Sequence, residues 1–444
     1  MKKLITLLIL FVGMVSSASA IDYYVSGDHR VLPSSSDWGI REENKMHATS
    51  VENVYALVVP SKDVTQGTDY LFKFVEKNGE TETWYGYDGG GNTTLTFDAS
   101  ATYTIVFYYD ASQHRGRFIA TPMLRWDLGD SGNGNWSWNY EAASLFTNVD
   151  DFTWTYEILP SKFTKDTSFR LYSAAWNKSA YPSGTNVVPS YGGESSNSAY
   201  FNYVYSTEWC WRISKPTYTF EKVVLTATYK PFDSTNGADF GQWEVKADAY
   251  VTKTVRGDYK YATLGCPVPL DIVEANSVSA YPLTADASKG KITKGSAITT
   301  IPANEGALLE NTTGSNQTIR AKVLASAASS ASNDLHAYTG TGNITQPGSG
   351  STYYILGVQD EHVGFYKVNP NPSGNAMGAN TAYLSVSGVL AREFFAFDDG
   401  ETTGIEAMKA TQKMNGEYFN LAGQRVAQPT KGLYIVNGKK VIMK

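Results

Sequence analysis

The sequence predicts an all-β protein of tandem β-sandwich modules. Three observations carry this prediction: short segments in which apolar residues recur at every second position, turn residues at the ends of these segments, and the lack of helical periodicity. In segment 70–74, Tyr70, Phe72 and Phe74 share one face of a strand. The same alternation predicts strands with one apolar face at Tyr103, Ile105, Phe107 and Tyr109, and at Val223, Leu225, Ala227 and Tyr229. Gly, Asn, Asp or Pro residues bound such segments. No stretch of a dozen residues after the leader shows a convincing amphipathic helical pattern.

The N-terminus carries the features of a secretory signal peptide. Lys2 and Lys3 precede an apolar run at 4–15 and a small-residue stretch that ends at Ala20. We expect residues 1–20 to be the leader, with cleavage after Ala20. The run is shorter than the roughly 20 residues that span a bilayer, and no later segment resembles it, so no membrane-spanning segment is expected after removal. Because the first cysteine is Cys210, no lipid anchor is expected at the cleavage site.

The charge balance excludes one class of partner. The chain has 37 basic and 43 acidic residues, and loss of the two leader lysines leaves it more acidic. Such a chain repels phosphate backbones, so nucleic acid is not an expected partner. Only Cys210 and Cys266 are available for a disulfide. An exported chain permits that bridge, but the two cysteines fall in different predicted modules, and both a bridge and two free buried thiols remain open.

An internal repeat organises the first part of the chain. Residues 27–28 and 60–62 (Gly-Asp and Pro-Ser-Lys) are matched by residues 129–130 and 160–162, which predicts two related sandwiches at 21–120 and 121–254, the second with an insertion. All ten tryptophans lie between Trp38 and Trp243. After residue 250 the chain has no tryptophan and is rich in Ala, Ser, Thr and Gly, and this change in composition predicts a third all-β module at 255–400. A small hairpin-like tail follows at 401–444, with strands at 418–426 and 433–443 and a turn at Asn437-Gly438.

The tail resembles the C-terminal sorting domain of type IX secretion substrates. The resemblance rests on segment 418–426 (YFNLAGQRV) and segment 431–440 (KGLYIVNGKK). It implies that residues 404–444 contact the type IX secretion machinery and direct the protein to the extracellular side or the cell surface. A periplasmic location is the alternative.

The first two modules resemble immunoglobulin-like modules of glucan-active systems. Segments 70–75, 84–86 and 106–110 are similar to the module that accompanies pullulanases. The second module, from Gly129-Asp130 through 135–138 (NWSW), is similar to repeats in starch-binding outer-membrane proteins. Residues 258–399 look like a module recurrent in secreted surface proteins of the same bacteria. These resemblances imply binding of a starch-like glucan without catalysis.

Sugar rings have an apolar face and a polar rim, so their sites combine flat aromatics with short polar side chains. Aromatic residues in loops rich in Gly, Asn and Ser are therefore candidates, among them Trp84 and Tyr85, which we expect in a Gly-rich loop. Trp209 and Trp211 would share a strand face. The candidate carbohydrate-binding residues are Trp38, Trp84, Tyr85, Trp136, Trp138, Trp176, Trp209 and Trp211. Trp126, Trp154 and Trp243 alternate with apolar or small residues and are expected to fill sandwich interiors instead.

No catalytic, metal or cofactor site is predicted. The histidines are scattered without ligand spacing, at His29, His47, His114, His336 and His362. None lies in a nucleophile motif. The leading hypothesis is a secreted or cell-surface, non-catalytic binder of polysaccharide. The alternatives are an adhesin or structural surface protein that contacts host or matrix through its third module, and an accessory part of a polysaccharide-degrading enzyme system.

Overall fold

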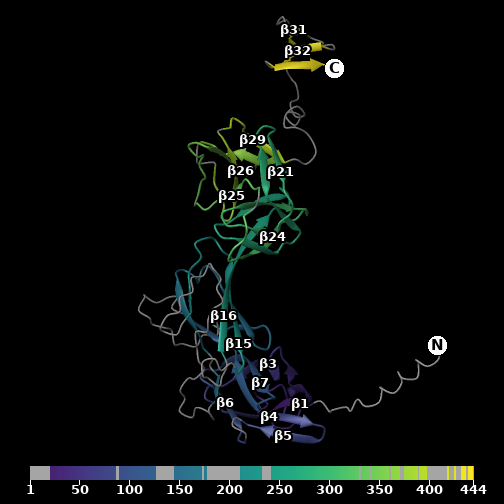
Figure 1. Cartoon of the computed structure of the whole chain (residues 1–444), viewed down its shortest axis with the longest axis vertical. Helices are drawn as coiled ribbons and strands as arrows, with labels where there is room; N and C mark the ends of the chain where they lie inside the picture. Colours follow the sequence, from purple (N-terminus) through teal and green to yellow (C-terminus); the bar gives the residue numbers. More distant parts are fainter. Residues whose placement is uncertain are drawn as a thin grey trace, which may run out of the picture.

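The computed structural model describes most of the chain after the predicted leader. The described residues are 21–86, 90–126, 145–172, 175–177, 211–232, 242–329, 332–340, 342–359, 362–370, 375–388, 390–397, 418–419, 425–426, 432–436 and 439–443. Within these ranges the chain consists of β-strands, turns and one short 3-10 helix, η1 (Glu42–Asn44). The prediction of an all-β protein is therefore confirmed. Figure 1 shows the sheets following one another along the long axis.

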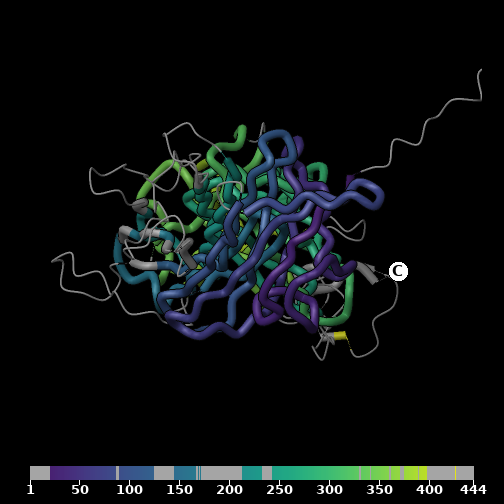
Figure 2. Tube along the Cα trace, turned by 90° about the horizontal axis from the view of Figure 1, so that it is seen from below, coloured from purple at the N-terminus to yellow at the C-terminus, as the bar shows by residue number. Residues whose placement is uncertain are grey.

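Two sheets form a sandwich at the N-terminal end of the described chain. The front outer sheet has the order β1-β4-β6-β13, with β5 also paired to β4. Its strands are β1 (Asp22–Gly27), β4 (Tyr70–Asn78), β5 (Thr81–Tyr85), β6 (Thr93–Phe97) and β13 (Ala175–Asn177). The front inner sheet has the order β2-β3-β7-β8, with β2 (His47–Ala48), β3 (Val54–Val64), β7 (Ala101–Asp110) and β8 (Arg115–Ala120). Figure 2, seen from below, shows this sandwich in purple and blue in front of the later strands.

The first core lies between these two sheets and is filled mainly by aromatic rings. Phe72 of β4 meets Phe107 of β7 edge to face, with ring centroids 4.8 Å apart. The residues predicted to share one face of each strand are all buried in this core: Tyr70, Phe72 and Phe74 from β4, and Tyr103, Ile105, Phe107 and Tyr109 from β7. The sequence-based prediction of these two faces is confirmed.

The second core is formed by buried residues of a seven-stranded sheet, which we call the long sheet, and of a three-stranded sheet, which we call the short sheet. The long sheet has the order β10-β11-β15-β16-β24-β18-β22, with β10 (Thr147–Asn148), β11 (Thr153–Ile158), β15 (Lys222–Lys230), β16 (Gln242–Val255), β24 (Gln317–Val323), β18 (Leu270–Glu274) and β22 (Thr300–Ile301). The short sheet has the order β14-β12-β9, with β14 (Trp211–Ile213), β12 (Thr167–Tyr172) and β9 (Met123–Trp126). The predicted face of β15, Val223, Leu225, Ala227 and Tyr229, is buried here, as expected.

The third core lies between a middle sheet and a rear sheet. The middle sheet has the order β17-β23-β19, with β17 (Tyr261–Gly265), β23 (Gly306–Asn311) and β19 (Val278–Tyr281). The rear sheet has the order β20-β21-β29-β27-β26-β28-β25, with β20 (Leu283–Asp286), β21 (Lys291–Lys294), β29 (Phe394–Phe397), β27 (His362–Lys367), β26 (Ser351–Gln359), β28 (Ala382–Ser387) and β25 (Leu335–Ala337).

Sheets buried on both faces join the three cores. On β7, Phe107 enters the first core and Tyr108 the second, where the Tyr108 hydroxyl lies 2.8 Å from that of Tyr229. On β23, Leu309 enters the second core and Leu308 the third. The predicted module boundary at 254/255 falls at the last residue of β16, which pairs with β15 on one side and β24 on the other. Successive units therefore share sheets instead of being linked by bare connectors.

The C-terminal tail sheet has the order β31-β30-β32-β33. Its strands are β30 (Tyr418–Phe419), β31 (Arg425–Val426), β32 (Gly432–Val436) and β33 (Lys439–Met443). Each of the two strands expected from the sequence is thus a pair of antiparallel strands. The expected turn at 437–438 lies outside the described residues, as do the predicted leader and Cys210. Cys266 is a free, buried cysteine, and burial raises the pKa of its thiol to about 11.

Candidate functional site

Trp38 lies in an exposed loop that closes one end of the front sandwich. We call residues 28–41 the Trp38 loop. The Trp38 side chain is among the exposed large hydrophobic groups, with 39% of the residue accessible. Its backbone has a φ of 47°, in the left-handed region that non-glycine residues rarely adopt. Because this much of a large apolar residue faces water at a costly backbone angle, the arrangement favours a role for the ring outside the fold.

The loop is fixed at several points, so the ring is held in a defined place. Val31 and Leu32 are fully buried in the first core. Ser34 and Asn44 form a buried pair, in which the Asn44 Nδ2 donates to Ser34 Oγ at 3.0 Å and the Ser34 amide donates to Asn44 Oδ1 at 3.1 Å. The Trp38 amide itself donates to the carbonyl of Gly27 at 3.0 Å. A preorganised platform of this kind loses little entropy when a ligand binds.

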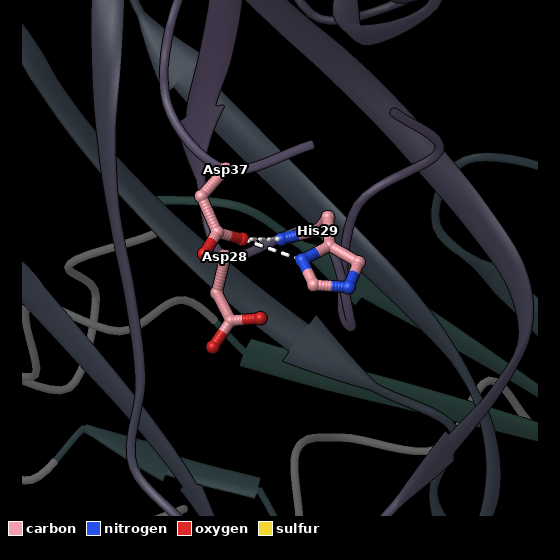
Figure 3. A group of neighbouring side chains, drawn as sticks. All are labelled: Asp28, His29 and Asp37. Atoms are coloured by element: carbon pink, nitrogen blue, oxygen red, sulfur yellow. Dashed lines mark hydrogen bonds and ion pairs between the residues drawn. The ribbon is translucent and has the colours of Figure 1, made fainter. Parts of the chain in front are cut away.

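Polar and charged groups surround the base of the loop (Figure 3). The His29 amide donates to Asp37 Oδ1 at 2.8 Å, and the His29 ring nitrogen Nδ1 lies 2.6 Å from the same oxygen. These two hydrogen bonds from His29 lower the pKa of Asp37. Asp28 accepts hydrogen bonds from the guanidinium of Arg30, with Nε to Oδ1 at 2.9 Å, and Arg30 also lies 4.8 Å from the centroid of Tyr70. Hydrogen-bonding groups of both charges, paired with one another, therefore lie in the same loop as Trp38.

Asp28, His29 and Asp37 are the candidate metal ligands among the described residues, since one ligand atom from each lies within 4.8 Å of the others. Two contacts argue against a cation here. The guanidinium of Arg30 already neutralises Asp28, and Asp37 Oδ1 is contacted by the backbone amide and the ring Nδ1 of His29. The geometry suits a hydrogen-bonding rim better than a metal centre. The only local signal of this cluster is a His and an Asp eight residues apart in a Ser-rich segment, and no site was predicted from it.

The same cluster lacks the partners of a nucleophilic site. A His-Asp pair activates a hydroxyl only when that hydroxyl is hydrogen-bonded to the imidazole. The serines of the loop make other contacts: Ser34 pairs with Asn44, and Ser36 Oγ accepts from Arg41 at 3.0 Å. Within the described part of the chain, no hydrogen bond joins His29 to a serine or a cysteine.

Trp84 and Tyr85 were expected in a Gly-rich loop, but they are the last residues of strand β5. Trp84 pairs with Val75 of β4, and Tyr85 pairs with Phe74. Both side chains are half-buried. Because Phe74 points into the first core, Tyr85 does too, and its ring packs beside Tyr109 with centroids 5.9 Å apart. Trp84 lies on the opposite, outer face of the same sheet.

Tyr85 belongs to a second aromatic group that we call the Glu76 cluster. Its members are Tyr23, Tyr55, Glu76, Tyr85, Tyr109 and His114. Glu76 Oε1 accepts from the Tyr109 hydroxyl at 2.9 Å and lies 2.9 Å from His114 Nδ1. Tyr85 stacks on His114 at 5.1 Å with an interplanar angle of 11°. Burial, followed by the contacts with Glu76, raises the pKa of Tyr109. Within this cluster the rings pack against each other, and the polar atoms of Glu76, Tyr109 and His114 contact each other.

The remaining predicted site residues are not brought together by the described structure. Trp136, Trp138 and Trp209 lie outside the described residues. For Trp176 in β13 and Trp211 in β14 only the backbone is described: Trp176 pairs with Thr96 and Trp211 with Phe169. The expectation that Trp154 and Trp243 fill the interior is confirmed, since both are buried in the second core, with ring centroids 5.4 Å apart. The Trp126 side chain is outside the description.

Comparison with known proteins adds no family to these observations. No protein-family model matches the chain, and no curated protein matches it. Within the described residues, no helix has the length and apolar character needed to cross a bilayer.

Proposed function

We propose that the protein is a non-catalytic carbohydrate binder exported to the cell surface, and that Trp38 is the stacking ring of one of its sites. The observation that carries the proposal is the exposed indole of Trp38, held at a φ of 47° on an anchored loop. An indole face attracts the C–H face of a sugar ring, and the ring's hydroxyl rim needs donors and acceptors nearby. Asp37, His29 and Arg30 supply both kinds of group.

A starch-like glucan is the proposed ligand, on the strength of the sequence resemblance of the first two modules. A single ring with a short polar rim gives weak binding, in the micromolar to millimolar range, on the order of 4 to 8 kcal/mol. A second site on the same glucan chain raises the overall affinity through effective concentration. The tryptophans of the second module that lie outside the described residues are candidates for that second site.

Export by the leader and sorting by residues 404–444 complete the proposal. The four-stranded tail sheet has its own pairing and joins none of the other described sheets. A small separate sheet suits recognition by a secretion machinery. Expression with and without residues 401–444, followed by fractionation of a host that has type IX secretion, tests this part. Retention inside the cell without the tail is expected.

Affinity electrophoresis through gels that contain starch, pullulan, other glucans or host glycans tests the binding proposal. The wild-type protein is expected to be retarded by at least one of them, and Trp38→Ala to lose roughly 2- to 12-fold in affinity, the worth of one stacked ring. Tyr259→Ala is the matched control. Tyr259 is 37% exposed beside an Arg-Asp pair, like Trp38, but lies outside the front sandwich. No retardation of the wild type in any gel, or equal loss in both variants, would contradict the proposal.

A further inference from the structure

The rear sheet has a face that the function proposed for Trp38 does not use. Strands β25, β28, β26, β27 and β29 are consecutive in this sheet. One face packs into the third core through Leu335, Leu384, Tyr354, Phe365 and Phe395. Because side chains alternate along a strand, their neighbours point to the opposite face. We call that opposite face the rear platform.

Aromatic side chains cross the rear platform from strand to strand. On one side, His336 pairs with Tyr383, and the Tyr383 ring contacts Tyr353 at 4.6 Å. On the other side, Tyr366 pairs with Phe394, with ring centroids 4.6 Å apart. Ile355 pairs with Tyr366 and lies between the two groups. All of these side chains retain some exposure to solvent.

Two glycines let the rings lie along the sheet instead of standing away from it. A Cβ placed on Gly364 would come within 2.1 Å of Phe394 Cε2, so the Phe394 ring rests directly on the backbone at Gly364. A Cβ placed on Gly357 would lie 3.3 Å from Tyr366 Cδ2. The Tyr366 hydroxyl donates to the carbonyl of His362 at 2.7 Å, which fixes the ring along its own strand. A ring held down in this way turns a face to solvent.

The rear platform carries no formal charge of the Asp, Glu, Lys or Arg type. Among the described residues of the five strands, those on this face are aromatic, aliphatic, glycine, serine, glutamine and histidine: His336, Tyr383, Ser385, Ser387, Ser351, Tyr353, Ile355, Gly357, Gln359, His362, Gly364, Tyr366, Phe394 and Ala396. Aromatic faces carry negative partial charge and attract the positive C–H face of a sugar, while Ser385 and His336 offer hydrogen bonds to hydroxyls. Across these five strands the pattern is complementary to a neutral, hydroxylated partner. The first charged side chains on the same face lie beyond β29, where Lys291 of β21 pairs with Ala396 and Asp286 of β20 pairs with Lys291.

We propose that the rear platform is a second carbohydrate-binding site, which takes an extended chain of neutral sugars across the strands. The five strands span roughly 19 Å at the usual inter-strand spacing, so a short oligosaccharide reaches both ring groups. The site is independent of Trp38, since it is built entirely from the rear sheet. It also supplies a second contact point on the same polymer for a protein whose sheets follow one another along a single axis (Figure 1).

Hydrogen exchange with mass spectrometry on the full mature chain tests the proposal without any substitution. The probes are oligosaccharides of starch, cellulose and xylan, each added in excess. At least one probe is expected to slow exchange in peptides that cover 351–367 and 382–397. The Trp38→Ala protein is expected to keep this protection, which separates a failure at Trp38 from a failure here. Unchanged exchange of these peptides with every probe would overturn the proposal.

Substitutions on the rear platform measure how much individual side chains contribute to the affinity for the oligosaccharide. Tyr366→Ala and Phe394→Ala should each weaken binding of the protecting oligosaccharide roughly 2- to 12-fold in calorimetry. Ile355→Lys places a charge between the ring groups without removing a ring, and should weaken binding while the fold is kept. Tyr259→Ala is the control and should bind as the wild type does. Wild-type affinity in all three platform variants would contradict the proposal. So would a dimeric wild type that Ile355→Lys makes monomeric, because the face would then be a contact between two copies of the chain.

Discussion

The two ends of the front sandwich have similar residue types, but at one end the aromatic rings pack against each other and at the other the indole is exposed. The Trp38 loop and the Glu76 cluster each combine at least one aromatic ring, a histidine and at least one carboxylate. At the Glu76 cluster, the Tyr109 hydroxyl and His114 both contact one carboxylate oxygen, and the Tyr23 ring lies 4.0 Å from that of Tyr55. At the Trp38 loop, the carboxylates pair with His29 and Arg30, and the indole has a solvent-facing surface.

The difference shows what separates a structural aromatic cluster from a candidate binding surface. The kinds of residue present do not separate them, because both ends carry aromatic, histidine and carboxylate side chains. What differs is the ring, because polar groups pair with one another at both ends, but only the Trp38 indole is exposed. Buried polar groups that pair internally contribute to stability, whereas an exposed ring on an anchored loop presents an apolar surface to another molecule.

The largest expected effect of a substitution is at the Glu76 cluster. Glu76→Ala removes the acceptor of the nearly fully buried Tyr109 hydroxyl and the partner of His114. An unsatisfied buried group of this kind costs about 1 to 3 kcal/mol. Denaturant unfolding should therefore show a loss of that size, while glucan retardation stays as in the wild type. Glu80→Ala, in the exposed turn after β4, is the control and should change stability little. Equal effects of the two substitutions would show that the cluster is not an energetic unit.

Next in size is a paired substitution of one ring at each end. Tyr85→Ala removes a half-buried ring that packs on Tyr109 and His114, and we expect a loss of about 2 kcal/mol in the free energy of unfolding. Trp38→Ala should stay within about 0.5 kcal/mol, as is usual for surface substitutions. Thermal unfolding of the two variants measures the contrast. A large loss at Trp38 would mean that the indole supports the fold.

At the front sandwich, alkaline pH should act on the Glu76 cluster through Tyr23. Burial first, and then the neighbouring Tyr55 and Glu76, raise the pKa of Tyr23 from 10.0 to about 12. A group whose pKa is raised on folding stabilises the fold below its unfolded pKa and loses that contribution as the pH rises. Stability should therefore decline between pH 10 and about 12. Tyrosinate absorbance recorded together with unfolding checks this, with Tyr23→Phe expected to flatten the decline.

The smallest effect is expected at Asp37. Two hydrogen bonds from His29 lower its pKa below 3.8. A lowered pKa gives a contribution that is present above the unfolded value and is lost as the pH falls through the folded one. The glucan affinity contributed by the Asp37 carboxylate should hold down to about pH 3.8 and fall below it. Affinity gels run on both sides of this value measure it, and Asp37→Asn should remove the acid-dependent step.

The sequence predicted the parts of the fold that depend on local alternation. The apolar faces of β4, β7 and β15 are where the residues indicated, because a strand with one buried face must alternate. Alternation also places Glu76 on the face of Phe72 and Phe74, a signal of the Glu76 cluster that was visible in the sequence and not used. The placement of Trp84 and Tyr85 in a loop was wrong, because β5 extends to the residue before Gly86.

Non-local pairing set the limit of what the sequence could predict. Nothing local indicates that β13, at 175–177, pairs with β6 in the front outer sheet, or that β16 joins β15 to β24. The rear platform was invisible for the same reason, because its rings come from strands that are neighbours only after folding. The proximity of Asp28, His29 and Asp37 depends on how the loop turns back at Gly27, where the Trp38 amide is bound.

Oxidation of tryptophan by N-bromosuccinimide, mapped by mass spectrometry with and without the retarding glucan, tests the central claim most directly. Trp38 should be oxidised quickly in the free protein and protected when the glucan is bound, while the buried Trp154 and Trp243 stay unmodified in both states. If Trp38 resists oxidation in the free protein, or reacts equally fast with the glucan bound, then the indole at this end of the sandwich is not the binding surface.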